Sequence, residues 1–296
     1  MTFEGVLAPV PTPFDDDERL DVDRLRAALR RWLTTPLRGF VILGSTGEAA
    51  FVDEQEADQI VGAAREIVPP TRPFIVGSGR ESTRSTVAAT KRAAALGADA
   101  VLVRTPGFFK AQMTMDALVR HYLAVADASP IPILLYNFTA VTGVNLLSAA
   151  VARLANHPNI VGVKESGGDV AQIADLVAST PADFSVLAGS ATTFYPALSV
   201  GAIGGILALS CVLPDACVRL YQLARERRYD EARDLQRQLA PVSRLVGSTY
   251  GVAGLKAALR IVEYDLGVPR SPLIPVSQSG MSALQDALTH FEKAAV

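Results

Sequence analysis

The segments IPILLYN at residues 131–137 and NIVGVKES at residues 159–166 repeat one pattern, an apolar run that ends in polar side chains. A continuous apolar run of this kind is typical of a strand buried on both faces of a parallel sheet. Between the two lies an Ala-rich segment, starting near Ser148, whose apolar residues recur at the spacing of an amphipathic helix. Parallel strands need such a crossover, so the pair predicts a strand-helix-strand unit.

The same unit recurs along most of the chain. Apolar runs stand at residues 5–9, 39–43, 73–77, 100–103, 133–137, 160–164, 184–188 and 202–208. Helices are expected to begin near Asp21, Asp53, Ser82, Met115, Ser148, Val170, Thr193 and Asp215, several of which can accept a first-turn amide hydrogen bond. Eight units without an intervening linker predict an α/β fold, a closed (β/α)8 TIM barrel. An open, doubly wound sheet is the alternative.

The chain beyond residue 226 has a different character. Its candidate helices are YDEARDLQRQLAPVSRLV, GLKAALRIVEYDL and SALQDALTHFEKAAV, which Gly and Pro separate. We therefore expect a barrel catalytic domain over residues 1–226 and a C-terminal helical extension over residues 227–296.

Composition narrows the classes of protein to consider. The 296 residues carry 28 Lys and Arg against 30 Asp and Glu, with no long basic block, so nucleic acid is not an expected partner. The N-terminus has no signal-peptide or transit-peptide pattern, and glycines interrupt the weakly polar run at 197–214, so no membrane segment is expected. Two cysteines, Cys211 and Cys217, are too few for disulfides to stabilise a chain of this length, which favours a reducing, cytoplasmic location.

Working groups of a barrel come from the carboxyl ends of its strands and the loops that follow them. Among the lysines, only Lys164 falls on a predicted strand. Burial disfavours its charged ammonium and leaves more free amine, the form that attacks a ketone to give a Schiff base. The alternative is a strand-end lysine that reaches solvent.

Two further features stand at predicted strand ends. Tyr136 closes the strand in IPILLYN, where a phenol could relay protons, although a core tyrosine bonded to a carbonyl is the alternative. The turn GSTGE at 44–48 follows the strand at 39–43 and precedes a helix. Its hydroxyls and backbone amides could hold a carboxylate or a phosphate, although glycine-rich turns are common.

Metal and nucleotide cofactors find little support in the sequence. The histidines at 121, 157 and 290 are widely separated, and no metal-ligand spacing accompanies them. No G-x-G-x-x-G opens a helix, and no P-loop lysine follows a glycine-rich turn. We expect a mechanism that needs neither a metal nor a cofactor.

Taken together, GSTGE, the closing YN at 136–137 and GVKES at 162–166 resemble the dihydrodipicolinate synthase and N-acetylneuraminate lyase family. The spacing from Tyr136 to Lys164 also resembles that family, and the likeness runs from VLAPVPTPF to SPLIPV. The resemblance implies a (β/α)8 barrel with a C-terminal helical bundle, usually a homotetramer. It also implies class I aldolase chemistry on pyruvate or another 2-oxo acid.

The resemblance further implies a role for each matching residue. Lys164 would form the Schiff base and Tyr136 would relay protons. Ser45 would link to the tyrosine, and Thr46 would hold the pyruvate carboxylate. Gly189 in LAGS and Ile206 in GGIL match positions that line the pyruvate pocket.

The chain departs from the family pattern at two positions. The synthases that use aspartate semialdehyde typically read Y-N-x-P-x-R-T-G, where the arginine grips the carboxylate of the second substrate. Val141 stands at that position and cannot replace a guanidinium. Phe108 stands where a second tyrosine, reaching into a neighbouring subunit, would complete a hydroxyl relay. Both departures count against a role in lysine biosynthesis.

Longer segments favour one branch of the family. ESTRSTV, HPNIVGVKESGGDV and FSVLAGS, with Ser166 just beyond the lysine, resemble the 4-hydroxy-2-oxoglutarate aldolases, which release pyruvate and glyoxylate. We therefore expect a cofactor-free lyase of that kind, with a 2-oxo acid and an aldehyde as substrates. The alternatives are a dipicolinate-type synthase, a sugar-acid aldolase or dehydratase, and a barrel that binds 2-oxo acids without turnover.

Overall fold

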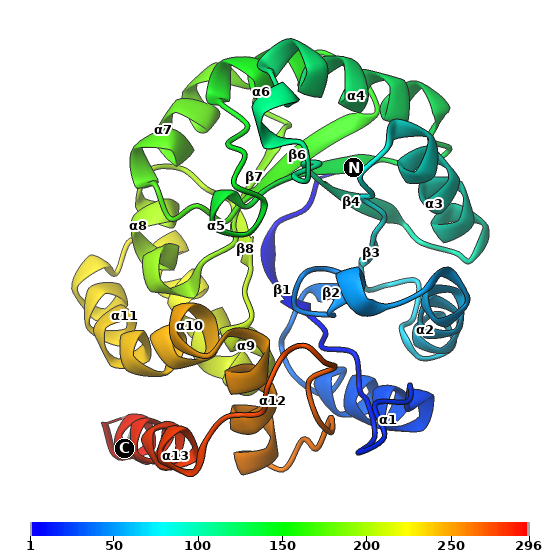
Figure 1. The fold of residues 1–296 in the computed structure, drawn as a ribbon. Helices are drawn as coiled ribbons and strands as arrows, with labels where there is room; N and C mark the ends of the chain where they lie inside the picture. Colours follow the sequence, from blue (N-terminus) through cyan, green and yellow to red (C-terminus); the bar gives the residue numbers. More distant parts are fainter. Residues whose placement is uncertain (1, 295–296) are drawn as a thin grey trace.

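In the computed structural model, which describes residues 2–294, eight parallel strands close into a barrel (Figure 1). They are β1 Gly5–Pro9, β2 Gly39–Ile42, β3 Phe74–Gly77, β4 Ala100–Arg104, β5 Ile133–Asn137, β6 Ile160–Glu165, β7 Ser185–Ala188 and β8 Gly204–Ile206. The first strand pairs with both β2 and β8, which closes the sheet. The predicted (β/α)8 barrel is thereby confirmed, and the open sheet is excluded.

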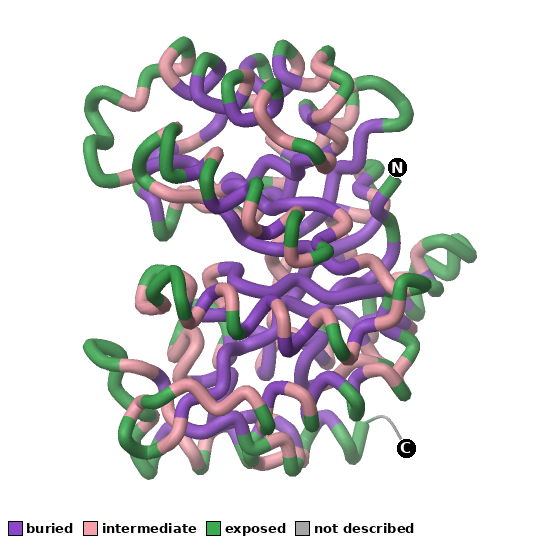
Figure 2. The backbone as a smooth tube through the Cα atoms, turned by 90° about the vertical axis from the view of Figure 1, so that its right-hand side faces the viewer, coloured by how far each residue is buried: buried purple, intermediate pink, exposed green. Residues whose placement is uncertain are grey.

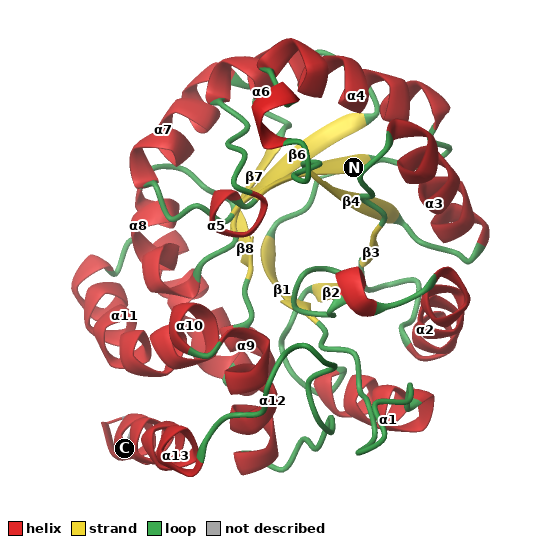
Figure 3. Ribbon diagram, viewed as in Figure 1, coloured by secondary structure: helices red, strands yellow, loops and turns green. Residues whose placement is uncertain are grey.

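Helices surround the strands, as Figure 3 shows. Those of the barrel are α1 Val22–Trp32, α2 Glu54–Ile67, α3 Thr83–Ala95, α4 Met115–Ala128, α5 Thr139–Thr142, α6 Ser148–Leu154, α7 Val170–Ser179, α8 Phe194–Ser199, α9 Leu209–Val212 and α10 Pro214–Arg225. Asp21, Asp53 and Ser82 accept hydrogen bonds from first-turn amides at the starts of α1, α2 and α3. These caps explain why the predicted helix starts agree with the structure.

The last strand is shorter than predicted. The apolar run at 202–208 contributes only Gly204–Ile206 to β8. Ala208 already has helical backbone angles and caps the start of α9. The apolar character of the run therefore reflects burial, which strand and helix share.

Alternating strand residues supply two separate cores. Side chains such as Leu134, Tyr136 and Ile206 fill the barrel interior, together with Phe3 and Leu7. The neighbouring strand residues point outward and pack under the helices. Figure 2 shows the buried strands running through the middle of the molecule, with exposed positions on the outer helices and loops.

A bulge sets the register between β5 and β6. Ile133 pairs with Ile160, but Leu134 pairs with Gly162, so Val161 is one extra residue in β6. Beyond the bulge, Tyr136 lies opposite Lys164 on the neighbouring strand. Because opposite residues of paired strands share a face, both side chains belong to the barrel interior.

The C-terminal segment is helical, as expected. It contains α11 Tyr229–Arg244, a π-helical turn at Leu245–Thr249, α12 Gly251–Ile261 and α13 Gln278–Ala294. Helix α11 packs on α8 and α10, whereas α12 packs on α9, and α13 contacts both α11 and α12 (Figure 1). The division into domains at residue 226 stays a prediction. None of the helices within 2–294 is long and apolar enough to span a bilayer.

Candidate active site

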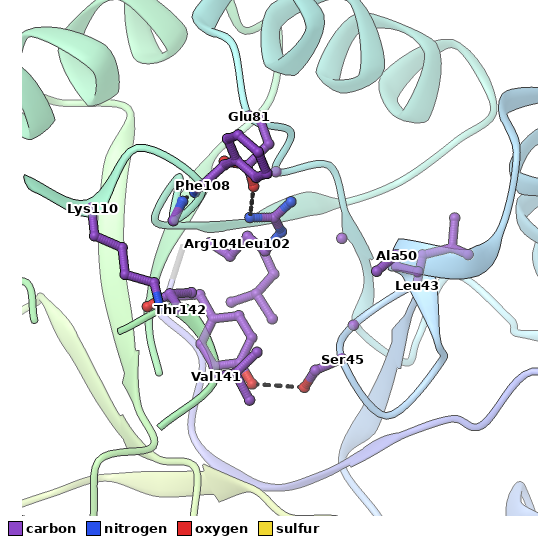
Figure 4. Close-up of a pocket in the computed structure, with 16 residues that line it drawn as sticks. Leu43, Ser45, Ala50, Glu81, Leu102, Arg104, Phe108, Lys110, Val141 and Thr142 are labelled. Atoms are coloured by element: carbon purple, nitrogen blue, oxygen red, sulfur yellow. Dashed lines mark hydrogen bonds and ion pairs between the residues drawn. The ribbon is translucent and has the colours of Figure 1, made fainter. Parts of the chain in front are cut away.

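A cavity of about 290 Å³ opens at the carboxyl ends of β2 to β5 (Figure 4). Of the predicted site residues, Ser45, Tyr136, Phe108 and Val141 line it. The rest of the lining is Leu43, Gly44, Ala49, Ala50, Gly77, Gly79, Glu81, Leu102, Arg104, Gly107, Lys110 and Thr142. The cavity therefore lies where barrel enzymes bind their substrates.

Lys164 is 3% exposed inside the barrel. Its ammonium nitrogen lies 4.4 Å from the centroid of the Tyr136 ring, which is itself buried. The lysine does not line the cavity but lies against its tyrosine wall. The solvent-reaching alternative for this lysine is therefore excluded.

The hydroxyls of Tyr136 and Ser45 are hydrogen-bonded at 2.9 Å, although the residues are far apart in the sequence. In Figure 4 this bond is the dashed line that starts at Ser45. Ser45 belongs to the turn after β2, where the amide of Gly47 donates to the carbonyl of Gly44. The structure thus brings together Lys164 of β6, Tyr136 of β5 and Ser45 of the turn after β2. Thr46 is partly buried in the same turn and does not line the cavity.

The remaining predicted binding residues lie deeper in the barrel or at its rim. Ile206 is fully buried in the interior cluster. Ser166 follows β6, and its buried hydroxyl oxygen has no hydrogen-bond partner among the described residues. It packs against Gly189, where an added Cβ would overlap the Ser166 side chain. The glycine thus makes room for a serine hydroxyl that a bound ligand could satisfy.

Two apolar side chains are exposed at the cavity mouth. Phe108 is 78% exposed and Val141 is 62% exposed, although both line the cavity. Phe109 beside them is also exposed and packs edge-on against the Phe108 ring. These positions form an apolar rim around the entrance, which we call the entrance rim: Phe108, Phe109 and Val141.

The carboxylate of Glu81, near the entrance rim, is surrounded by hydrogen-bond donors. Glu81 accepts hydrogen bonds from Arg104 and from the backbone amides of Gly107 and Phe108. Burial opposes ionisation of Glu81, but the bonds from these three donors outweigh it and hold its pKa below the usual value.

Lys110 also lines the cavity, and no ion pair engages it within residues 2–294. Its side chain leans on Gly143, where a Cβ would lie 3.0 Å from the ammonium nitrogen.

A polar network behind the lysine was not predicted from the sequence. Glu165 is buried, and it accepts hydrogen bonds from Asn137 at 2.6 Å and Gln172 at 2.9 Å. Burial raises its pKa, although the hydrogen bonds from Asn137, Gly167 and Gln172 oppose that shift. Strand alternation places this carboxyl outside the barrel, where it joins β5, β6 and α7. Its position next to Lys164 in GVKES was the available signal.

A second missed contact lies behind the GSTGE turn. Glu48 and Lys256 form an ion pair of 2.6 Å in which both side chains are almost fully buried. A lone lysine inside the apolar run of GLKAALRI indicates that its charge is compensated, but the run does not indicate which residue compensates it.

Other reactive groups do not assemble into a site. No cluster of three or more His, Cys, Asp or Glu that could hold a metal occurs in residues 2–294. Cys211 and Cys217 are free and buried, and burial raises the pKa of both thiols.

The sequence matches one known protein family over almost its whole length. Residues 2–291 match the model of the Dihydrodipicolinate synthetase family. The chain belongs to this family. It is therefore a lyase of the aldolase kind, as the resemblance of its motifs predicted.

Relatives within the dihydrodipicolinate synthetase family carry two different names. A 4-hydroxy-tetrahydrodipicolinate synthase of Xanthomonas axonopodis pv. citri is 38% identical, over 96% of this chain and 93% of that protein. A probable mitochondrial 4-hydroxy-2-oxoglutarate aldolase of Emericella nidulans is 34% identical, over 96% and 94%. The structure of the dihydrodipicolinate synthase of Thermotoga maritima superposes with a TM-score of 0.94 at 32% identity, and the match covers 99% of each chain. Family membership thus establishes the reaction class, but it does not establish which aldehyde takes part in the reaction.

Proposed function

We propose that the protein cleaves 4-hydroxy-2-oxoglutarate into pyruvate and glyoxylate through a Schiff base on Lys164. The observation that carries this proposal is the contact of Lys164, Tyr136 and Ser45 at the carboxyl end of the barrel. An amine, a phenol and a hydroxyl within reach of one another are the groups that iminium chemistry requires.

Schiff-base formation would begin at the free amine of Lys164. Its lone pair attacks the ketone carbon of the 2-oxo acid, and Tyr136 passes a proton to the oxygen that leaves as water. The hydrogen bond to Ser45 holds the phenol in the position for this transfer. Thr46 and the amides of the same turn would hold the substrate carboxylate, which gains strong hydrogen bonds from neutral donors.

Carbon-carbon cleavage follows from the iminium. Tyr136 accepts the proton of the 4-hydroxyl, the bond between C3 and C4 breaks, and glyoxylate leaves. The electron pair of the broken bond moves into the iminium and gives the enamine of pyruvate. Protonation at C3 and hydrolysis then release pyruvate and restore the lysine.

The charges at the entrance favour an aldehyde that carries a carboxylate. Arg104 is committed to Glu81, whereas Lys110 lines the cavity beside Val141 without an ion-pair partner among the described residues. An ammonium at the mouth would attract the carboxylate of glyoxylate. The small, apolar Val141 offers no fork-shaped clamp for a longer substrate.

Borohydride trapping tests the mechanism. Reduction in the presence of pyruvate should add one reduced pyruvate to the intact mass, and peptide mapping should place it on Lys164. Lys164→Ala, if folded by circular dichroism, should show no adduct and no turnover. An adduct on another lysine, or none in the wild type, would contradict the proposal and favour a barrel that only binds 2-oxo acids.

A kinetic comparison tests the aldehyde. The second candidate is 4-hydroxy-tetrahydrodipicolinate synthase, because several relatives bear that name. Condensation of pyruvate with glyoxylate should have a higher kcat/KM than condensation with aspartate semialdehyde. The opposite order would establish the second candidate. A sugar-acid aldolase would be indicated if neither aldehyde reacts but longer polyhydroxy aldehydes do.

We also propose that the protein assembles into a homotetramer and works in the cytoplasm. The exposed entrance rim supports the assembly, since apolar side chains gathered on a surface often mark an interface. Two buried, free cysteines suit a reducing compartment.

A further inference from the structure

The turn that carries Ser45 and Thr46 ends in a buried carboxylate. Glu48 has a left-handed backbone, with φ of 53°, and its side chain is fully buried. A residue other than glycine holds this conformation only when its surroundings enforce it. The surroundings of Glu48 therefore determine the shape of the turn.

Both oxygens of Glu48 are engaged from the C-terminal segment. The ammonium of Lys256, on α12, lies 2.6 Å from Oε1. The backbone amide of Arg270, in the loop after α12, donates to Oε2 at 2.8 Å. No solvent screens these contacts, because Lys256 is 2% exposed.

Lys256 is itself held in one position. Its ammonium donates to the carbonyl of Val268 at 2.7 Å and lies 4.6 Å from the centroid of the Phe14 ring. Burial lowers its pKa, while the adjacent Glu48 opposes the shift. The ion pair thus joins two side chains that other contacts hold in place. Moving either side chain would leave a buried charge unpaired.

The path from this pair to the reacting groups is short. The amide of Glu48 donates to the carbonyl of Ser45 at 3.1 Å, and the carbonyl of Gly47 accepts from the hydroxyl of Thr12 at 2.6 Å. The hydroxyl of Ser45 in turn contacts Tyr136. A rotation at Glu48 would therefore displace the hydroxyls of Ser45 and Thr46.

We propose that Glu48 and Lys256 are positioning residues, which fix the turn at 44–48 so that Ser45 meets Tyr136 and Thr46 faces the substrate carboxylate. The C-terminal helix α12 then belongs to the working active site, although it touches no substrate. This inference rests on the proposed function for the roles of Ser45 and Thr46, but the geometry of the turn can be measured without activity.

The test uses the double variant Glu48→Gln, Lys256→Met in the full-length protein. It removes both charges, so that no unpaired charge stays buried, and the new carboxamide oxygen can still accept from Arg270. Lys256→Met alone leaves Glu48 unpaired and serves as the harsher variant. Arg260→Met is the matched control, because Arg260 lies on the same helix and is exposed.

Three measurements decide the outcome. We expect the folded double variant to show faster amide hydrogen exchange at 44–48 and a longer distance between Ser45 and Tyr136 in a crystal structure. We expect its KM for pyruvate to rise at least about tenfold, the loss of one well-placed hydrogen bond to a charged group. Arg260→Met should leave all three unchanged.

A purely structural role gives a different pattern. The double variant would then lose thermal stability, while the exchange at 44–48, the Ser45 to Tyr136 distance and the KM of the folded fraction would match the wild type. That result would overturn the inference. If the proposed function is wrong, the wild type will give no Lys164 adduct with pyruvate and borohydride. Hydrogen exchange and the crystal structure still test the positioning role in that case, because neither measurement depends on activity.

Discussion

Lys110 shows how one side chain at the cavity mouth could select a substrate. It leans on Gly143, at the end of α5, and lines the same cavity as Tyr136. Figure 4 shows the Lys110 side chain reaching toward Thr142. Two roles are compatible with this place. The ammonium could stabilise the carboxyl end of the short helix α5, or it could bind the carboxylate of the aldehyde.

Lys110→Met separates these two roles. We expect kcat/KM to fall about tenfold or more with glyoxylate, and to change little with an uncharged aldehyde such as glycolaldehyde, because only glyoxylate loses an ionic contact. Steady-state kinetics with both aldehydes measure the difference. Lys91→Met, at an exposed position on α3, is the control. An equal loss with both aldehydes would assign Lys110 to α5 alone.

His121 links protonation to stability. The ring is 7% exposed, its Nδ1 lies 2.9 Å from the hydroxyl of Thr83, and burial lowers its pKa from 6.5 to about 4, although Glu81 opposes the shift. Between pH 6.5 and about 4, the unfolded chain binds a proton that the folded chain refuses. Acidification through this window therefore favours unfolding.

The free energy of unfolding should fall by up to about 3 kcal/mol between pH 6.5 and 4 on account of His121. Urea unfolding at several pH values measures this loss. His121→Gln has no titrating ring and should show a flatter dependence over the same range. Parallel curves for the wild type and the variant would assign the acid sensitivity to the carboxylates instead.

Among the elements, β6 is closely packed between its two neighbouring strands. Gly162 lies between β5 and β7, and an added Cβ would fall 2.5 Å from the carbonyl oxygen of Ser185 and 2.7 Å from Cδ2 of Leu134. The Ser185 carbonyl belongs to the backbone of β7, which pairs with β6, so it cannot move without disturbing the sheet. The Leu134 side chain is fully buried in the barrel interior and has little space to yield.

Gly162→Ala should therefore destabilise the protein by about 1–3 kcal/mol, and it should lower kcat because the displaced strand carries Lys164. Chemical denaturation and steady-state kinetics measure the two effects. Gly62→Ala is a matched control in α2, where an added Cβ meets nothing within 4 Å. That control should gain about 0.5–1 kcal/mol, since alanine favours helices. Equal effects of the two substitutions would refute the packing argument.

Sequence patterns predicted most elements because local chemistry determines them. Apolar runs gave the strands, and Asp21, Asp53 and Ser82 marked helix starts through their own cap hydrogen bonds. The proximity of Ser45, Tyr136 and Lys164 followed from the rule for strand ends. The contact between Glu48 and Lys256 could not be predicted, because neither residue's local sequence specifies a partner so far along the chain.

For the whole molecule, the entrance rim raises the question of assembly. Phe108, Phe109 and Val141 expose 78%, 65% and 62% of their surfaces at the mouth of the site. Water contact with so much apolar surface is unfavourable, and a second copy of the chain would remove it.

Light scattering should therefore give about four times the chain mass of 31.3 kDa. The variant Phe108→Ser, Phe109→Ser should shift the mass downward if the rim lies in an interface. Tyr229→Ser is the control, since this side chain is 55% exposed on α11, away from the rim. A wild-type mass of one chain would refute the assembly.

The bulge at Val161 also bears on how this chain can change in length. Because residues 162–165 already lie opposite residues 134–137, deleting Val161 would restore regular pairing with β5 and keep Lys164 opposite Tyr136. Deleting Val163 would instead place Lys164 opposite Leu135, whose side chain points under the helices. The face on which Lys164 lies is thus set by its distance from Gly162 inside the strand, whereas the loops on either side of α6 remain open to insertion. Descendants of this gene should therefore vary in the loops, tolerate loss of the bulged residue and keep the spacing of residues 162–165.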